Sequence, residues 1–111
     1  MVWPQRGLQL ARRYAVTAMF QWDAGNIDKN LKHGVHDWEI EEALLDPHGR
    51  LIDKTVLGGE ERYTWLGRAV TSGKYVRVVY TLRQDATGSM LIRPISAVEM
   101  SLSEKRRYRR K

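Results

Sequence analysis

Residues 75–83 read YVRVVYTLR and carry the clearest strand pattern of the chain. Five of the nine side chains favour β-structure, namely Val76, Val78, Val79, Tyr80 and Thr81. Side chains alternate between the two faces of a strand, so Val76, Val78 and Tyr80 form an apolar face. An apolar face must be covered, and this stretch therefore predicts a central strand of a sheet with helices packed on one side.

The neighbouring segments continue the two-residue period. We predict strands at Arg50–Lys54, Glu61–Arg68 and Met90–Ala97, with turns at Gly58-Gly59, Ser72-Gly73 and residues 85–89. Pro94 has no N–H to give to a ladder, which predicts an edge position or a bulge. The consecutive strands and short turns predict an antiparallel meander.

Before residue 48 the pattern is helical. A short strand is expected at Val16–Gln21, followed by a helix over Ala24–His33 with Asp23 as N-cap and Gly34 after its last turn. Ile27 and Leu31, spaced i, i+4, form the apolar stripe of that helix.

Asp37 is expected to cap a second helix, which Asp46-Pro47 ends. At the other end of the chain, Ser101 and Glu104 form a capping box for a last helix over Leu102–Arg109. The fold class is α+β: a small domain with a twisted antiparallel sheet, two N-terminal helices packed on it and a C-terminal helix. The expected core is Phe20, Ile27, Leu31, Leu44, Val76, Val78, Tyr80 and Ile92, with Trp38 and Trp65 also inside.

Composition restricts the function. The 111 residues include no cysteine, which excludes disulfides and thiolate sites and agrees with a cytoplasmic location. No stretch has the roughly 20 apolar residues of a membrane span. Of the three histidines, His33 and His36 lie near each other but flank Gly34 and have no third ligand at metal-site spacing. We therefore expect neither a metal nor a cofactor.

Charge gives the strongest functional signal. The net charge is +6, with 19 basic and 13 acidic residues, and acidic residues concentrate in residues 17–46. The basic residues that we single out on the later predicted strands and the first helix are Arg62, Arg68, Arg77, Arg83, Arg93, Lys29, Lys32 and His33. Arginines on a sheet face beside aromatic rings suit phosphate and base stacking. Patterning alone favours the alternative that these basic residues only lie on a solvent-exposed face or form ion pairs with Glu60, Glu61 and Asp85.

Several motifs together resemble the BrnT family. They are Phe20-Gln21-Trp22-Asp23 with Asn26, Lys32-His33-Gly34-Val35, Glu41-Glu42-Ala43 with Asp46-Pro47, Glu60-Glu61-Arg62-Tyr63 with Leu66-Gly67-Arg68, Val78–Arg83, Ile92–Ala97 and Glu104–Tyr108. The similarity runs from about Met19 to Tyr108. It implies a toxin of a type II toxin–antitoxin pair, with a RelE-like fold and metal-independent endoribonuclease activity.

The resemblance also implies partners and roles. The toxin would cleave RNA by attack of the substrate's 2′-hydroxyl on the adjacent phosphate. A BrnA-like antitoxin would neutralise it and would be its only link to operator DNA, and no membrane is involved. We expect catalytic roles for Arg62, Arg83 and Arg93 as phosphate ligands and for Lys32 or His33 in proton transfer. We expect Lys29, Arg68, Arg77 and Tyr80 to bind RNA.

Two features depart from the family. Val98 stands where BrnT proteins commonly have an arginine, and residues 1–18 precede the resemblance. We expect residues 1–18 to be an extension and 19–111 to be the toxin domain. The alternative function is a non-catalytic basic module that binds nucleic acid or an acidic protein with the same surface. An enzyme for a small phosphorylated ligand fits less well, since the chain has no phosphate loop.

Overall fold

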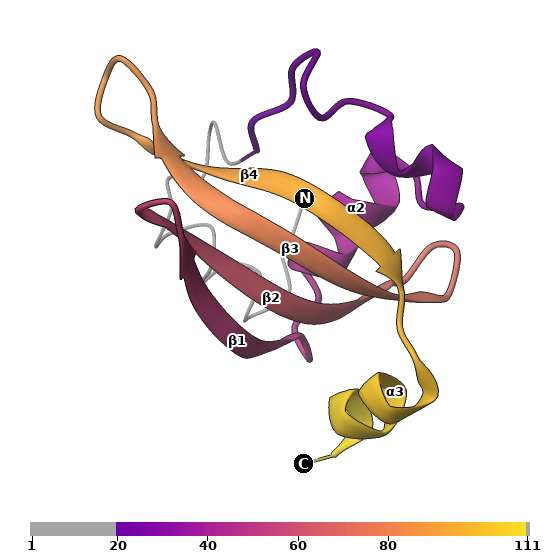
Figure 1. The fold of residues 1–111 in the computed structure, drawn as a ribbon. Coiled ribbons are helices and arrows are strands. Elements are labelled where there is room, and N and C mark those ends of the chain that lie inside the picture. Colours follow the sequence, from indigo (N-terminus) through magenta and orange to yellow (C-terminus); the bar gives the residue numbers. More distant parts are fainter. Residues whose placement is uncertain (1–19, 111) are drawn as a thin grey trace.

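The computed structural model describes residues 20–110 as an α+β fold (Figure 1). The elements, in chain order, are a 3₁₀ helix η2 (Lys29–His33), α2 (Asp37–Leu44), β1 (Arg50–Leu57), β2 (Glu60–Ala69), β3 (Lys74–Gln84), β4 (Met90–Glu99) and α3 (Leu102–Arg109). The expected strand at Val16–Gln21 and the extension 1–18 lie outside the described residues, except that Phe20 forms a single parallel bridge to Ile92.

The four strands form one antiparallel sheet in the order β1-β2-β3-β4, as predicted. All four are longer than the sequence pattern indicated, and β1 gains most because it pairs with β2 over its whole length. The tight turn at Gly58-Gly59 needs the left-handed region, with φ of 59° and 80°. The sheet is therefore a meander of adjacent hairpins.

Pro94 meets both expectations for a strand proline. It lies in β4, an edge strand, and Ile95 beside it is the extra residue of a bulge, since Val79 pairs with Ser96 and Tyr80 with Pro94. The segment before η2 runs along this edge. The Gln21 amide donates to the Ile92 carbonyl at 2.9 Å, and the Asn26 side chain donates to the Pro94 carbonyl at 3.0 Å. These bonds partly close the β4 edge.

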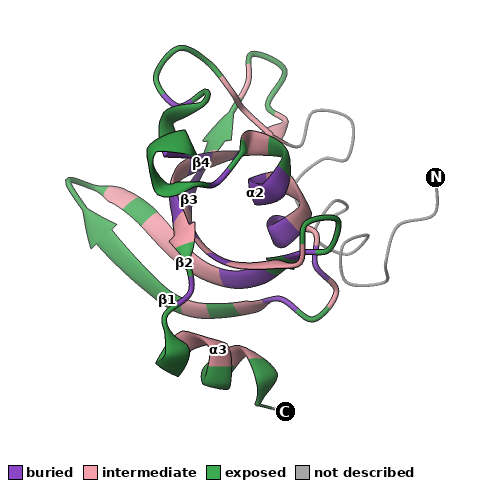
Figure 2. Ribbon diagram, turned by 90° about the vertical axis from the view of Figure 1, so that its right-hand side faces the viewer, coloured by how far each residue is buried: buried purple, intermediate pink, exposed green. Residues whose placement is uncertain are grey.

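Helix α2 packs on one face of the sheet, with its buried residues turned toward the strands (Figure 2). Its backbone comes very close to β2: a Cβ on Gly67 would lie 2.0 Å from the Ala43 carbonyl oxygen. The Trp65 indole donates to that same oxygen at 2.8 Å. The helix begins one residue earlier than predicted, with His36 and not Asp37 as N-cap, and the Glu39 carboxylate accepts from the His36 amide at 2.9 Å.

The prediction of a helix over Ala24–His33 is wrong. Residues 24–28 form turns, Asp28 has φ 55°, and only the short η2 follows before Gly34, which has the expected positive φ of 75°. Two asparagines explain this. Asn26 bonds to Gln21 and Pro94 carbonyls, and the Asn30 side chain accepts from the Ala97 amide at 3.0 Å. This polar face, rather than an apolar stripe, is turned toward the sheet.

The core expectations are confirmed on the sheet and on α2. Leu44, Val76, Val78, Tyr80 and Ile92 are buried, and Phe20 and Trp65 pack against them half-buried. Ile27, Leu31 and Trp38 are exposed, which contradicts the prediction. Ile27 and Leu31 are exposed because the predicted helix over Ala24–His33 does not form. The Trp38 ring stacks on His36 at the surface.

Helix α3 lies on the other side of the sheet from α2 (Figures 1 and 2). Its bounds and its capping box are those predicted, with the Ser101 hydroxyl accepting from the Glu104 amide and the Glu104 carboxylate from the Ser101 amide. None of its residues is buried. It is anchored by the Tyr108 hydroxyl, which donates to the buried Asp46 carboxylate. No helix within residues 20–110 is long and apolar enough to cross a membrane.

Candidate nucleic-acid interface

The sheet face turned away from α2 carries a row of arginines. Strand register places on it Arg62 and Arg68 of β2, Arg77 and Arg83 of β3 and Arg93 of β4. Leu66 of β2 pairs with Arg77 of β3, and Thr81 of β3 pairs with Arg93 of β4. Paired residues point to the same face of the sheet, so the arginines of all three strands lie on one face. We call this surface the arginine face. It has two ends, which differ in composition.

At one end, three arginines and a lysine meet around a pocket of about 140 Å³. Arg62, Arg83, Arg93 and Lys29 line it, together with Glu60. We call this the arginine pocket. The strands supply the arginines, and the turn after Phe20 supplies Lys29 through the bonds that hold Asn26 on β4. Residues far apart in sequence thus gather four cations around one small hollow.

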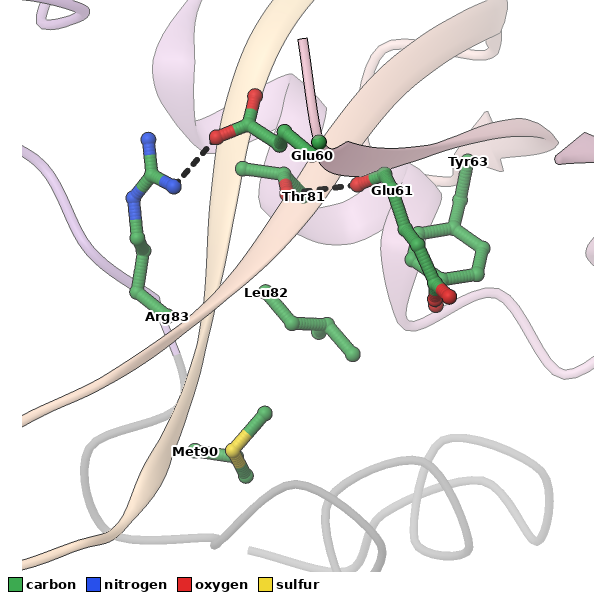
Figure 3. A pocket seen from close by; sticks show the side chains of 8 residues that line it. Glu60, Glu61, Tyr63, Thr81, Leu82, Arg83 and Met90 are labelled. Carbon is green, nitrogen blue, oxygen red and sulfur yellow. Dashed lines mark hydrogen bonds and ion pairs between the residues drawn. The ribbon is translucent and has the colours of Figure 1, made fainter. Parts of the chain in front are cut away.

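The arginines of this pocket already form ion pairs with carboxylates. Glu60 lies between Arg83 and Arg62, with Arg62 Nε 3.2 Å from its Oε1, and Figure 3 shows the pair with Arg83. Asp23 accepts two bonds from Arg93, at 2.8 and 3.1 Å. The hydrogen bond from Arg83 lowers the pKa of Glu60, and the bonds from Arg93 lower the pKa of Asp23. Both carboxylates are therefore ionised near neutrality.

A second hollow, of about 380 Å³, adjoins the pocket and shares Glu60 and Arg83 with it (Figure 3). Its other side is apolar, formed by Leu82 and Met90, with Tyr63 nearby. The Thr81 hydroxyl beneath it donates to the Glu61 carbonyl at 2.7 Å. A charged wall and an apolar wall therefore meet at Arg83, an arrangement suited to a phosphate next to a flat base.

At the other end of the arginine face lie Arg68 and Arg77. Arg77 pairs with Glu104 of α3 at 3.4 Å. The Arg68 guanidinium lies over the Tyr75 ring, 5.2 Å from its centre. Neither lines the arginine pocket.

The structure does not bring Lys32 and His33 to the pocket. Both are exposed, and the carbonyl of the next residue, Gly34, accepts from Lys74 at 2.6 Å. Lys74 is nine residues before Arg83 on β3, which is about 30 Å along the strand. The segment with Lys32 and His33 therefore lies near the opposite end of β3 from the pocket. Tyr80 is also elsewhere: it is 3% exposed and stacks on Tyr63 in the core, with ring centres 5.2 Å apart. Of the predicted site residues Lys29, Lys32, His33 and Tyr80, only Lys29 lines the pocket.

The roles of two acidic residues that bond the pocket arginines were not predicted from the sequence. Asp23, predicted as a helix cap, accepts from the Gly25 amide and from Arg93. Glu60 was named only as one of three possible partners; of the other two, Glu61 pairs with Lys54, and Asp85 bonds within its own turn. The alternation that placed Arg62 and Arg83 on one face could have pointed to Glu60, two residues from Arg62 on the same face.

Within residues 20–110, no three of the histidine and carboxylate side chains come close enough together to hold a metal ion. The charged groups that line the pocket are three guanidinium groups, one ammonium and one carboxylate.

Comparison with known families gives one match. Residues 22–104 match the family described as the ribonuclease toxin BrnT of type II toxin–antitoxin systems. The chain belongs to the BrnT family. A search of curated proteins found no match. The matched range contains every residue of the arginine pocket, and it ends inside α3 at Glu104. The family consists of ribonuclease toxins of type II toxin–antitoxin systems, and membership therefore implies an antitoxin partner. The position of Val98 is opposite Arg77 on the arginine face.

Proposed function

We propose that this BrnT protein is a metal-independent endoribonuclease that cleaves RNA in the arginine pocket. The observation that supports this most directly is the convergence of Arg62, Arg83, Arg93 and Lys29 from separate elements on one hollow. A guanidinium fork clasps phosphate oxygens through two parallel bonds. Three guanidinium groups and the Lys29 ammonium exceed what the fold needs, since surface ion pairs contribute little to stability.

Cleavage of one phosphodiester bond needs three catalytic functions. A base takes the proton of the 2′-hydroxyl as its oxygen attacks phosphorus, cations hold the charge that develops on the phosphoryl oxygens, and a donor protonates the leaving 5′-oxygen. The arginines supply the charge, and Lys29 is placed to serve as the donor. The products are a 2′,3′-cyclic phosphate and a 5′-hydroxyl.

Glu60 is the proton acceptor in this scheme. It is the carboxylate between Arg62 and Arg83, and its lowered pKa keeps it ionised and able to accept. The sequence had suggested Lys32 or His33, but both lie away from the pocket. When phosphate enters, it replaces Glu60 as the partner of the two arginines, which leaves the carboxylate free to face the 2′-hydroxyl.

The test is cleavage of a labelled RNA by purified protein, with and without a chelator. We expect activity to survive the chelator, and Arg83→Ala and Arg93→Ala each to lower the rate by about 10²–10³. Arg106→Ala, which removes an exposed arginine of α3, is the matched control and should cleave like the parent. Full activity in both pocket variants would place the site elsewhere.

One observation favours a second candidate, the non-catalytic binding module. All three pocket arginines already have carboxylate partners, as in a surface that only needs to stay soluble. Salt-sensitive RNA binding with no product, from the parent protein, would support this alternative.

The antitoxin would bind the same surface. A BrnA-like protein with an acidic segment, disordered alone, would fold across Arg62, Arg83 and Arg93, inhibit by covering the pocket, and carry the pair to operator DNA. Both proteins would act in the cytoplasm, where the RNA is. The competing docking site is the tail, Lys105–Lys111. Deleting it would also remove Tyr108, the anchor of α3, so charge variants separate the two ideas better.

Arg83→Glu should strongly weaken binding of the antitoxin if the arginine face is the interface. The double variant Arg106→Gln/Arg110→Gln should then leave antitoxin binding unchanged. The reverse result would move the interface to the tail. Binding of purified antitoxin, measured as association and dissociation rates, reads both.

A further inference from the structure

The far end of the arginine face holds a second group of cations, of which the sequence predicted only Arg68 as an RNA-binding residue. The Tyr75 ring of β3 has Arg68 of β2 and Arg109 of α3 each 5.2 Å from its centre, and Lys105 of α3 at 5.7 Å. Tyr108 meets its edge at 5.6 Å. We call these residues the tyrosine cluster. Lys105 and Arg109 are one helical turn apart, so both point to the same side of α3.

Among residues 20–110, no Asp or Glu forms an ion pair with Arg68, Lys105 or Arg109. The nearby carboxylate, Asp46, is buried and accepts from the Arg68 amide, the His48 amide and the Tyr108 hydroxyl. Glu104 of α3 pairs with Arg77.

Three positive charges around one ring repel one another, and they are held by the ring face and, for Arg68, by the Gly73 carbonyl at 3.5 Å. The site therefore favours an anion that can lie among all three. The Tyr75 hydroxyl adds a donor at the same place. The hydrogen bond from Arg109, and after it the charge of Arg68, lowers the pKa of Tyr75.

The cluster is in line with the arginine pocket. Tyr75 and Arg83 are eight residues apart on β3, hence on the same face and about 26 Å from each other. Arg77 lies between them on that face. A single RNA strand several nucleotides long can reach from one end to the other.

We infer that the tyrosine cluster is a second phosphate-binding site, which holds the RNA backbone several nucleotides from the bond that is cleaved. This rests on the proposed function for the identity of the polyanion. The site gives length dependence and affinity to an enzyme whose arginine pocket is too small to hold more than one phosphate and its neighbours.

The experiment measures binding of a fluorescent twelve-nucleotide RNA with 2′-O-methyl groups, which cannot be cleaved, over a range of salt. The test variant is Lys105→Gln/Arg109→Gln. The matched control is Arg106→Gln/Arg110→Gln, which removes the same charge from the same region but not from the ring. Each phosphate contact adds about 0.7 to the slope of log affinity against log salt for a single strand.

We expect the test variant to lose about 0.7 from this slope and to bind several-fold more weakly at low salt, with the control close to the parent. Equal slopes for the two double variants would overturn the site. A test variant that binds RNA normally but loses antitoxin binding would also overturn it, because the cluster would then belong to the protein interface. Failure of the parent to bind any RNA would overturn the proposed function along with it.

Discussion

The two ends of the arginine face use the same side chains in opposite electrostatic states. In the arginine pocket, Glu60 and Asp23 neutralise the guanidinium groups, so an incoming phosphate must displace a carboxylate. In the tyrosine cluster, an aromatic ring holds the cations, and within residues 20–110 none of the three forms an ion pair with a carboxylate. Under the proposed function, the first arrangement would be selective, because only a well-placed anion outcompetes the carboxylate, and the second would bind an anion without displacing one. The difference would then separate recognition of the reacting phosphate from binding of the rest of the RNA.

The largest expected effect comes from removing the competitor at the arginine pocket. Glu60→Gln keeps the size of the side chain but removes its charge and its ability to accept a proton. We expect the cleavage rate to fall about 10²–10⁴-fold, the typical share of a general base. Affinity for uncleavable RNA should rise by up to about fivefold, since a partly exposed ion pair contributes at most about 1 kcal/mol. The two readouts are single-turnover cleavage and RNA binding.

The matched control for this change is Glu61→Gln. Glu61 is the sequence neighbour of Glu60 but pairs with Lys54 and Tyr63, outside the arginine pocket. It should leave cleavage at the parent rate. If Glu60→Gln cleaves normally, the carboxylate only balances charge, and the asymmetry between the two ends has no catalytic meaning.

A change of middle size loosens the tyrosine cluster. Tyr108→Phe removes the hydroxyl that binds α3 to the buried Asp46 carboxylate, a bond to a charged group worth about 1.5–3 kcal/mol. We expect the free energy of unfolding to fall by about that amount in a denaturant titration. RNA affinity should fall as well, because Lys105 and Arg109 depend on the placement of α3, while cleavage of RNA already bound should persist. Unchanged stability would mean that α3 is held by its other contacts.

The smallest effect is the position of a titration. The cations of the tyrosine cluster lower the pKa of Tyr75, whereas burial and the bond to Asp46 raise the pKa of Tyr108. Tyr75 should therefore ionise at lower pH than a free tyrosine, and its ionised form adds stability that is lost as the pH falls through its folded pKa. The difference between parent and Tyr75→Phe in a tyrosinate absorbance titration measures it. A bound phosphate should move this titration back upward.

The sequence was informative wherever local chemistry decides the structure. Alternation in Tyr75–Arg83 predicted the central strand and its buried face, and the missing N–H of Pro94 predicted an edge and a bulge. Ser101 and Glu104 predicted the start of α3, because a capping box is satisfied within four residues. These features depend on neighbours along the chain.

It failed where distant partners decide. Asn26 and Asn30 are polar positions of an expected helix, but their bonds to Pro94 and Ala97 turn the segment into turns and a 3₁₀ helix. Alternation likewise placed Arg62 and Arg83 on one face but could not show that Asp23 reaches Arg93 from seventy residues away. The tyrosine cluster was invisible for the same reason, since it joins β2, β3 and a tail that by itself resembles a solvated helix end.

The partly closed edge of β4 has a consequence for how copies of this chain would meet through their sheets. A sheet with two open edges can add a further strand at each edge and so grow without limit. Here the bonds from Gln21 and Asn26 and the bulge at Pro94 obstruct pairing along β4, and β1, with Val56 and Leu57 exposed, is the more open edge within residues 20–110. Strand addition between two copies would therefore favour pairing of β1 with β1, which uses up the open edges in a dimer and does not lead to a fibre.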